Sequence, residues 1–509
     1  MTSLNRLLSE LRRDGVELWL DGGQLCFRSS NGIVGAKWQD ELRARKPEII
    51  AFLQEARRAS QQATPIATGP RPGRLPLSFS QQRLWSLERL GGVGWSYNSP
   101  WALLLEGALN RTALELSLSE VVRRHESLRT RFEVPDEEAA QVIDDAGTFR
   151  LQVTDLPGPA GEERDGEVRS VVEAHANRRF DLVSGPLFRA ALLPLSEFEH
   201  VLLVTVHQIV CDGWSKGILA RELSTLYRAF SQGRPAPLPE LPLQYPDYAL
   251  WQRAWLQGEV LESQVQYWKG RLAGAPSSLE LPTDRARPAV PSFNGETVPV
   301  AVSVELSRSL QELARRQGAT LYMVLLAAFQ ALLSRWSGQK DIVVGTPIPG
   351  RTRRETEGSI GLFVSSLPMR ADLSGEPTFE ELVDQVKETT LGAYAHQELP
   401  FAKLVEQLRP AQYLSRLPIF QVVFALYHDP QEVLQLPGLK LRGLGYTPVM
   451  AKFDLTLGLA ETPEGLRGAL QYATDLFDRG TIEGLARNFQ ALLAGIVADP
   501  GRRCAGRSQ

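Results

Sequence analysis

The sequence is poor in cysteine, the residue that builds disulfide bonds and many zinc sites. Its three cysteines, Cys26, Cys211 and Cys504, are far apart, and no pair has the spacing of metal ligands. An odd and scattered set argues against a disulfide framework and against structural zinc. The sequence also lacks a Walker A lysine loop and a GxGxxG fingerprint, so we expect no bound nucleotide, nicotinamide or metal.

Long apolar runs and an excess of one charge are missing as well. No run approaches the roughly 18 apolar residues that span a bilayer, and the N-terminus lacks the order of a signal peptide. The 56 basic residues nearly balance the 59 acidic ones, which argues against a surface that coats nucleic acid. The sequence therefore predicts a cytoplasmic globular protein of roughly two to four compact units, with no membrane or nucleic-acid partner.

The first 58 residues have the pattern of a small separate domain. Leucines at helical spacing over residues 4–11 predict a short helix, and two strand-like runs over residues 16–27 flank an Asp-Gly-Gly turn. Two helical patterns complete an αββαα order. Residues 59–74 are rich in proline, glycine and threonine, which is typical of a linker.

From residue 75 onward, strand-like and helical patterns alternate. Residues 201–206 form a continuous apolar run that predicts a buried strand, and residues 321–336 predict a long apolar helix. Such alternation is typical of α/β architecture, and the junction of two lobes is a natural place for an active site. We expect two lobes, over residues 75–255 and 256–500.

The segment His207-Gln-Ile-Val-Cys-Asp-Gly213 follows the predicted buried strand directly. A loop that carries His, Cys and Asp at the end of a strand has the composition of a catalytic site. The same pattern fits a histidine and an aspartate that only hydrogen-bond to hold a loop. The segment by itself leaves both interpretations open.

The rest of the chain favours chemistry, because this segment resembles the HHxxxDG core of nonribosomal peptide synthetase condensation domains. Other motifs of that family have counterparts in the expected order, at residues 77–87, 124–132, 244–251, 360–370, 396–404 and 416–424. The resemblance covers about residues 75–500. It implies two chloramphenicol-acetyltransferase-like lobes that form a V-shaped pseudo-dimer.

The resemblance also implies a reaction and its partners. Donor and acceptor peptidyl carrier proteins would deliver thioesters on phosphopantetheine arms, and the acceptor amine would attack the donor thioester to form an amide. No covalent enzyme intermediate is expected, so catalysis would depend on positioning, proton handling and oxyanion stabilisation. The Asp-Gly-Trp-Ser context resembles domains that join an L-donor to an L-acceptor, although starter and modifying relatives share it. We expect the chain to be part of a larger synthetase.

Position 208 departs from the family. The first histidine of the pair, thought to be structural, is His207, but Gln208 occupies the place of the catalytic histidine. Glutamine can donate and accept hydrogen bonds but cannot take up a proton near neutrality. If the histidine acts as a general base, its loss should lower the rate by about 10²–10⁴-fold; if it only orients the amine, the loss should be smaller.

Two explanations of Gln208 stay open: an inactivating substitution, or drift to a scaffold that binds carrier proteins without turnover. Epimerisation and free acyl transfer share the fold, but the Asp-Gly-Trp-Ser context counts against the first and the N-terminal unit against the second. A thiol mechanism at Cys211 is the weaker alternative to a buried core cysteine. Ser365 stands where the family usually has asparagine near the tunnel, and this change either reshapes the acceptor pocket or is neutral.

The remaining site residues follow from the resemblance. Asp212 would hold the loop through a salt bridge, with Arg285 or Arg287 as its partner. The backbone N–H of Gly213 is a candidate oxyanion donor, because glycine allows close approach of a substrate. Trp214 is expected to be a packing residue.

The N-terminal unit resembles the TubC-like docking domains of hybrid synthetase subunits. The resemblance implies that the hairpin over residues 16–27 receives the C-terminal docking peptide of an upstream subunit as an added strand. Basic side chains would attract an acidic peptide, unless they are only a surface cluster; they are Lys37, Arg43, Arg45 and Lys46.

Overall fold

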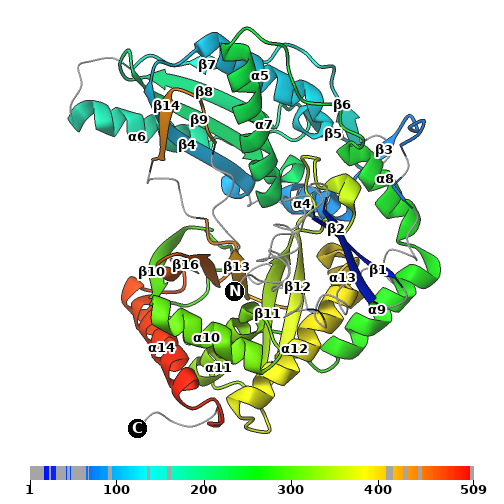
Figure 1. The fold of residues 1–509 in the computed structure, drawn as a ribbon, viewed down its shortest axis with the longest axis vertical. Helices are drawn as coiled ribbons and strands as arrows, with labels where there is room; N and C mark the ends of the chain where they lie inside the picture. The colour runs from blue at the N-terminus through cyan, green and yellow to red at the C-terminus, as the bar shows by residue number, and fades with distance from the viewer. Residues whose placement is uncertain are drawn as a thin grey trace.

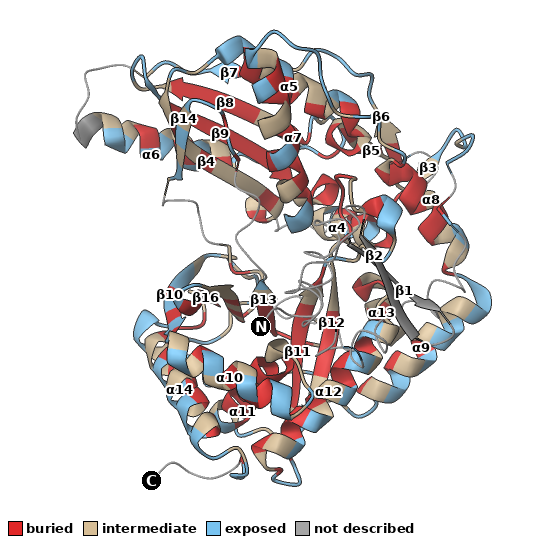
Figure 2. Cartoon of the chain, in the orientation of Figure 1, coloured by how far each residue is buried: buried red, intermediate tan, exposed pale blue. Residues whose placement is uncertain are grey.

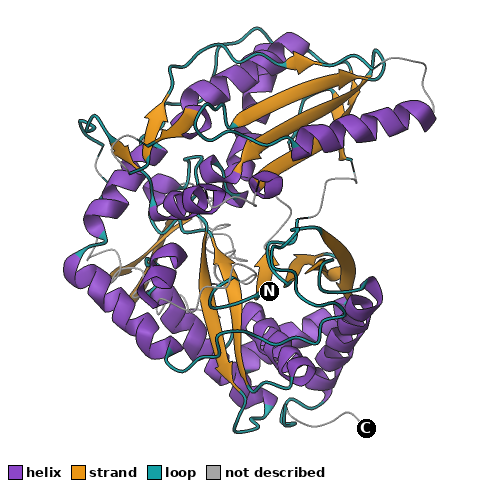
Figure 3. Ribbon diagram, turned by 180° about the vertical axis from the view of Figure 1, so that it is seen from behind, coloured by secondary structure: helices purple, strands orange, loops and turns teal. Residues whose placement is uncertain are grey.

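The structure is a computed structural model with two α/β lobes, each built on its own sheet (Figure 1). It describes residues 16–21, 24–29, 42, 46, 65–66, 68–89, 94–134, 138–156, 162–408, 417–427, 434–444 and 450–504. The lobes are joined along one side by α8 (Tyr245–Trp255) and α9 (Gly258–Leu272) and diverge on the other, as the predicted V requires. Figure 3 shows the same arrangement from behind.

The first lobe is organised around a five-stranded sheet. In spatial order its strands are β14 (Leu439–Gly443), β4 (Asn98–Gly107), β9 (Glu199–His207), β8 (Phe188–Pro194) and β7 (Gln152–Val153). In β9, Leu202 and Val204 belong to the core under α5 and α7, whereas Val201 and Leu203 pack against α6 on the opposite face (Figure 2). Because both faces are covered, the strand is apolar throughout, and the predicted buried strand is confirmed.

A small three-stranded sheet and several helices complete this lobe. The strands are β3 (Leu75–Pro76), β6 (Ala140–Ile143) and β5 (Thr130–Glu133). The helices are α4 (Phe79–Arg89), α5 (Arg111–Arg124), α6 (Glu162–Asn177) and α7 (Gly213–Ser231). The side chain of Asn110 caps α5 by accepting the Ala113 N–H, which satisfies one of the N–H groups left open at a helix start.

The second lobe has a six-stranded sheet. Its order is β10 (Gly295–Val302), β16 (Gly465–Ala473), β15 (Leu455–Thr462), β13 (Val422–Tyr427), β11 (Asp341–Ile348) and β12 (Ser365–Asp372). Its helices are α10 (Val304–Arg316), α11 (Leu321–Ser337), α12 (Phe379–Ala395), α13 (Phe401–Leu408) and α14 (Arg479–Ala498). The predicted apolar helix is α11, which is buried from Met323 to Ser334.

No single helix in the described part of the chain is long and apolar enough to cross a membrane. The helices α10 and α11 meet that length and composition test only as a pair, which is bent by 104°.

Two segments cross from the second lobe to the first. The strand β14 lies within the range predicted for the second lobe, yet it pairs antiparallel with β4 at the edge of the first lobe's sheet. The long loop over residues 349–364, between β11 and β12, bonds to first-lobe residues, as described below. The division at residue 255 is therefore wrong for β14, since a sequence pattern shows a strand but not the sheet it joins.

The N-terminal hairpin is present as predicted. The strands β1 (Val16–Asp21) and β2 (Gln24–Ser29) pair antiparallel, with Asp21 opposite Gln24. Lys46 is helical and exposed. The other three predicted docking residues, Lys37, Arg43 and Arg45, lie outside the described residues.

Candidate functional site where the two lobes meet

The segment from His207 to Gly213 turns from the end of β9 into α7. The short 3-10 helix η4 (Gln208–Val210) follows His207, whose Nδ1 accepts the Ile209 N–H at 3.2 Å. The carboxylate of Asp212 then caps α7 by accepting the Ser215 N–H at 2.8 Å. Caps at both turns fix the segment relative to the buried strand.

His207 is buried and neutral. It is 1% exposed and lies beside the rings of Tyr97 and Phe180. Burial, followed by the nearby charges of Lys452 and Arg189, lowers the pKa of His207 to about 3. Because Nδ1 accepts a hydrogen bond, Nε2 carries the proton of the neutral ring, and it has no hydrogen-bond partner among the described residues. A histidine in this state is not a base at neutral pH.

Asp212 ties the loop of the second lobe to the first. Its Oδ2 accepts the N–H groups of Phe363 at 2.9 Å and Val364 at 3.1 Å. Its Oδ1 accepts the Ser215 hydroxyl at 2.7 Å and forms an ion pair with Arg351 at 3.3 Å. The side chains of Asp212 and Arg351 are 1% and 2% exposed, so this is a buried charge pair. The role predicted for Asp212 is structural, and these contacts support it.

The predicted partner of Asp212 is wrong. Arg351, which lies on the crossing loop, takes that place; Arg285 binds the carboxylate of Asp478, and Arg287 binds that of Asp454. Sequence proximity to a motif of the second lobe does not show which arginine reaches the other lobe.

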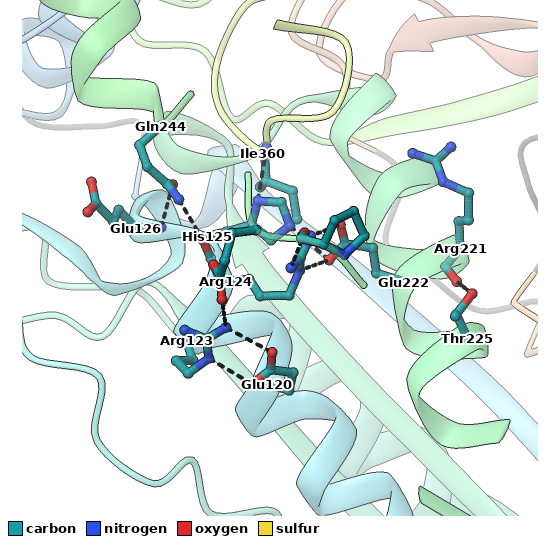
Figure 4. A network of polar contacts seen from close by, with 12 residues as sticks. Glu120, Arg123, Arg124, His125, Glu126, Arg221, Glu222, Thr225, Gln244 and Ile360 are labelled. Atoms are coloured by element: carbon teal, nitrogen blue, oxygen red, sulfur yellow. Dashed lines mark hydrogen bonds and ion pairs between the residues drawn. The ribbon is translucent and has the colours of Figure 1, made fainter. Parts of the chain in front are cut away.

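The Arg-His-Glu motif near residue 125 supports the same loop (Figure 4). His125 Nε2 lies 3.0 Å from a carboxylate oxygen of Glu222, which also accepts from Arg124 at 3.1 Å. His125 Nδ1 accepts the N–H of Ile360, a residue of the crossing loop, at 3.3 Å. Burial opposes ionisation of Glu222, but the hydrogen bonds from His125 and Arg124 outweigh it and lower its pKa. This motif therefore positions the loop.

Gln208 contacts a residue of the other lobe. The amide oxygen of Gln208 accepts a hydrogen bond from the Nζ of Lys452, which lies just before β15. The same Nζ lies 4.4 Å from the centre of the Tyr97 ring. Although Lys452 keeps some exposed surface, burial of its ammonium group and then repulsion by Lys216 lower its pKa to about 7.

Sequence reasoning missed Lys452. It considered only histidines and Cys211 as substitutes for the absent histidine, and Lys452 lies 244 positions from Gln208. No local pattern separates this lysine from other lysines; only the pairing of β15 with β13 and β16 brings it to the site.

Four other predicted residues have clear surroundings. Cys211 is buried, and burial together with Asp212 raises the pKa of its thiol to about 12, as expected of a core cysteine. Trp214 is 49% exposed and donates to the Glu357 carbonyl at 3.2 Å, so the prediction of a packing residue is wrong. Ser365 Oγ accepts the Phe401 N–H at the start of α13.

Gly213 is exposed and begins α7. A Cβ at this position would meet no protein atom within 4 Å, so the protein itself does not require glycine here. Within the described ranges, no group of three or more His, Cys, Asp or Glu side chains could hold a metal ion.

Two family models match the chain. Residues 72–506 match the model of the condensation domain, and residues 5–55 match that of the TubC N-terminal docking domain. Together they cover most of the sequence.

Curated proteins and solved structures give the same result. The chain is 48% identical over 455 residues to part of a linear gramicidin synthase from Brevibacillus parabrevis, and 45% identical over 457 residues to malpinin synthetase from Mortierella alpina. Each alignment covers 89% of this chain but only 6% of the synthetase. The X-domain from teicoplanin biosynthesis, solved in complex with OxyB, is 35% identical with a TM-score of 0.81, over 88% of this chain and 98% of that one.

Proposed function

The chain belongs to the condensation-domain family of nonribosomal peptide synthetases, and from this we propose that it joins a donor acyl or peptidyl thioester to the amine of an acceptor aminoacyl thioester. Donor and acceptor carrier proteins present both groups on phosphopantetheine arms. The observation that carries the proposal is the placement of residue 208, the family's catalytic position, at a contact between the two lobes.

Each residue of the motif has a role in this reaction. Asp212 is a positioning residue, because it fixes the crossing loop and the start of α7 at the same time. The N–H of Gly213 belongs to the first turn of α7, where backbone donors are open, and we assign it to the oxyanion of the tetrahedral intermediate. The exposed glycine leaves a substrate room to approach.

Gln208 makes this domain a slow catalyst. Its amide can orient the acceptor amine but cannot remove a proton, so restoring histidine should raise turnover by about 10²–10⁴-fold. A carrier-binding scaffold without turnover is the second candidate. The likeness to the X-domain, which was solved bound to OxyB, favours this candidate, because it shows a relative of the same fold in a complex with a protein partner.

The N-terminal unit gives the chain a partner upstream. We propose that residues 1–58 dock the C-terminal peptide of a preceding subunit, that residues 59–74 are a linker, and that β1 or β2 offers the edge for an added strand. The exposed Lys46 suits an acidic peptide.

Peptide-bond formation between loaded carrier proteins tests the function. The chain and its Gln208→His variant are compared under single-turnover conditions, with binding of each loaded carrier measured in parallel. A faster variant supports a condensation catalyst in which Gln208 is the lesion. Binding of carriers by both proteins without turnover by either would favour the scaffold, and equal turnover would show that position 208 needs only a hydrogen-bonding side chain.

A further inference from the structure

Lys452 approaches Gln208 from the opposite lobe, at the position where the family places its catalytic histidine. We propose that Lys452 is a catalytic residue of this chain and that its neutral amine accepts the proton that Gln208 cannot take. The inference rests on the condensation activity proposed above and explains how turnover persists without a histidine at position 208.

The contacts of Lys452 leave its amine available for this task. Both partners, the Gln208 amide oxygen and the Tyr97 ring, are uncharged, so neither holds the lysine as an ammonium in the way a carboxylate would. A neutral amine has two N–H donors and one lone pair. Donation to Gln208 fixes the nitrogen and leaves the lone pair for a substrate proton, which makes Gln208 a positioning residue.

The backbone around Lys452 is held on both sides. The Ala451 N–H donates to the Phe293 carbonyl at 3.0 Å, and the Asp454 N–H donates to the Gln421 carbonyl at 2.9 Å. The carboxylate of Asp454 is also bound by Arg287. A base fixed in this way needs little rearrangement during reaction, which is what makes proton transfer by a side chain efficient.

The charges that face Lys452 keep its proton affinity low. Lys216 on α7 repels the ammonium form, His207 at the end of β9 is neutral, and burial raises the pKa of Tyr97, so its phenol stays neutral. With its pKa at about 7, Lys452 is present in both protonation states at neutral pH. A general base is most effective when its pKa lies near the working pH.

The reaction is balanced with this single residue. The acceptor amine attacks the donor thioester carbonyl, a C–N bond forms, and the intermediate carries O⁻ and a positively charged nitrogen. Lys452 Nζ takes one proton from that nitrogen. The intermediate then collapses, the C–S bond breaks, and the leaving pantetheine thiolate takes the proton from Lys452, which returns to the neutral amine.

Single-turnover rates between pH 5.5 and 9 test the proposal in two variants of the chain. Lys452→Met removes the base, and Lys452→Arg keeps a cation that donates to Gln208 but cannot lose its proton. We expect both to lower the rate by about 10²-fold or more. A rate close to that of the chain in Lys452→Met, or full activity in Lys452→Arg, would overturn the proposal, the latter because a positive charge would then suffice.

The pH profile separates the lysine from the substrate. The rate of the chain should rise through about pH 7 and level off above it, because the neutral amine is the active form. The acceptor amine titrates in the same direction, so the profile is compared with that of Gln208→His, which has the same substrate. In Lys216→Met, the loss of repulsion should move the midpoint of the chain to higher pH; an unchanged midpoint contradicts the assignment of the pH dependence to Lys452.

A readout without substrate completes the test. Competitive acetylation with acetic anhydride, followed by peptide mass spectrometry, gives the pKa of Lys452 directly, and a value above about 9 would overturn the proposal. Gln208→His reports the function separately. If it turns over while the chain shows no turnover, or while Lys452→Met has no effect in the chain, only the role of Lys452 fails. If no variant forms the amide, the proposed function itself fails.

Discussion

Removing the carboxylate of Asp212 should separate its structural role from any chemical one. In Asp212→Ala, the guanidinium of Arg351 stays in a site where its side chain is 2% exposed, and the N–H groups of Phe363 and Val364 lose their acceptor. Breaking a buried ion pair on one side lowers the free energy of unfolding by about 3–5 kcal/mol, because an uncompensated charge remains. The lost cap of α7 acts in the same direction and is worth about 1 kcal/mol.

Urea denaturation with linear extrapolation measures this loss. In a double-mutant cycle, adding Arg351→Met to Asp212→Ala should recover part of the stability, with a coupling of about 0.5–3 kcal/mol. Asp144→Ala is a control, because its ion pair with Arg131 lies on the surface, where such pairs contribute little. If Asp212→Ala loses no more stability than Asp144→Ala, Asp212 does not hold the lobes together.

Two further predictions concern His207 and the glycines. The folded pKa of His207, about 3, is below its ordinary value of 6.5, so the unfolded state binds more protons between these values and stability falls as the pH drops from about 6.5 toward 3. His207→Asn keeps an acceptor for the Ile209 N–H and should weaken this dependence; equal losses between pH 7 and 5 in urea titrations would contradict the buried neutral ring. Gly361→Ala should destabilise the protein by about 1–3 kcal/mol, because its Cβ would lie 1.9 Å from a ring carbon of Tyr245. Gly213→Ala, which meets no atom within 4 Å, should change thermal stability little, and similar melting temperatures for the two variants would argue against that clash.

The sequence was most informative where one segment contains its own explanation. The run from residue 201 to 206 has no polar face because α6 covers one side of β9 and α5 and α7 the other. The apolar residues of α11 likewise predicted a buried helix, and the Asp-Gly-Gly turn predicted the hairpin of β1 and β2. In each case the periodicity and the turn chemistry act within a few residues.

Contacts between distant segments were not predictable in this way. Arg351 binds Asp212 because the loop between β11 and β12 enters the first lobe, and no spacing along the chain encodes that path. Lys452 reaches Gln208 for a similar reason, since its position depends on strand order in the second sheet. Trp214 was expected to pack, but the first turn of α7 faces outward. The motif thus located the site but did not give its partners.

The pairing of β14 with β4 has a consequence for synthesis on the ribosome. The edge of β4 leaves the exit tunnel long before Leu439–Gly443, the segment that covers it. On the order of 300 residues separate them, which at about 5–20 residues per second amounts to tens of seconds. During that interval the nascent first lobe exposes an open strand edge that other chains can pair with. Chaperone binding to ribosome-bound chains should therefore be strongest between the completion of β9 and the emergence of β14.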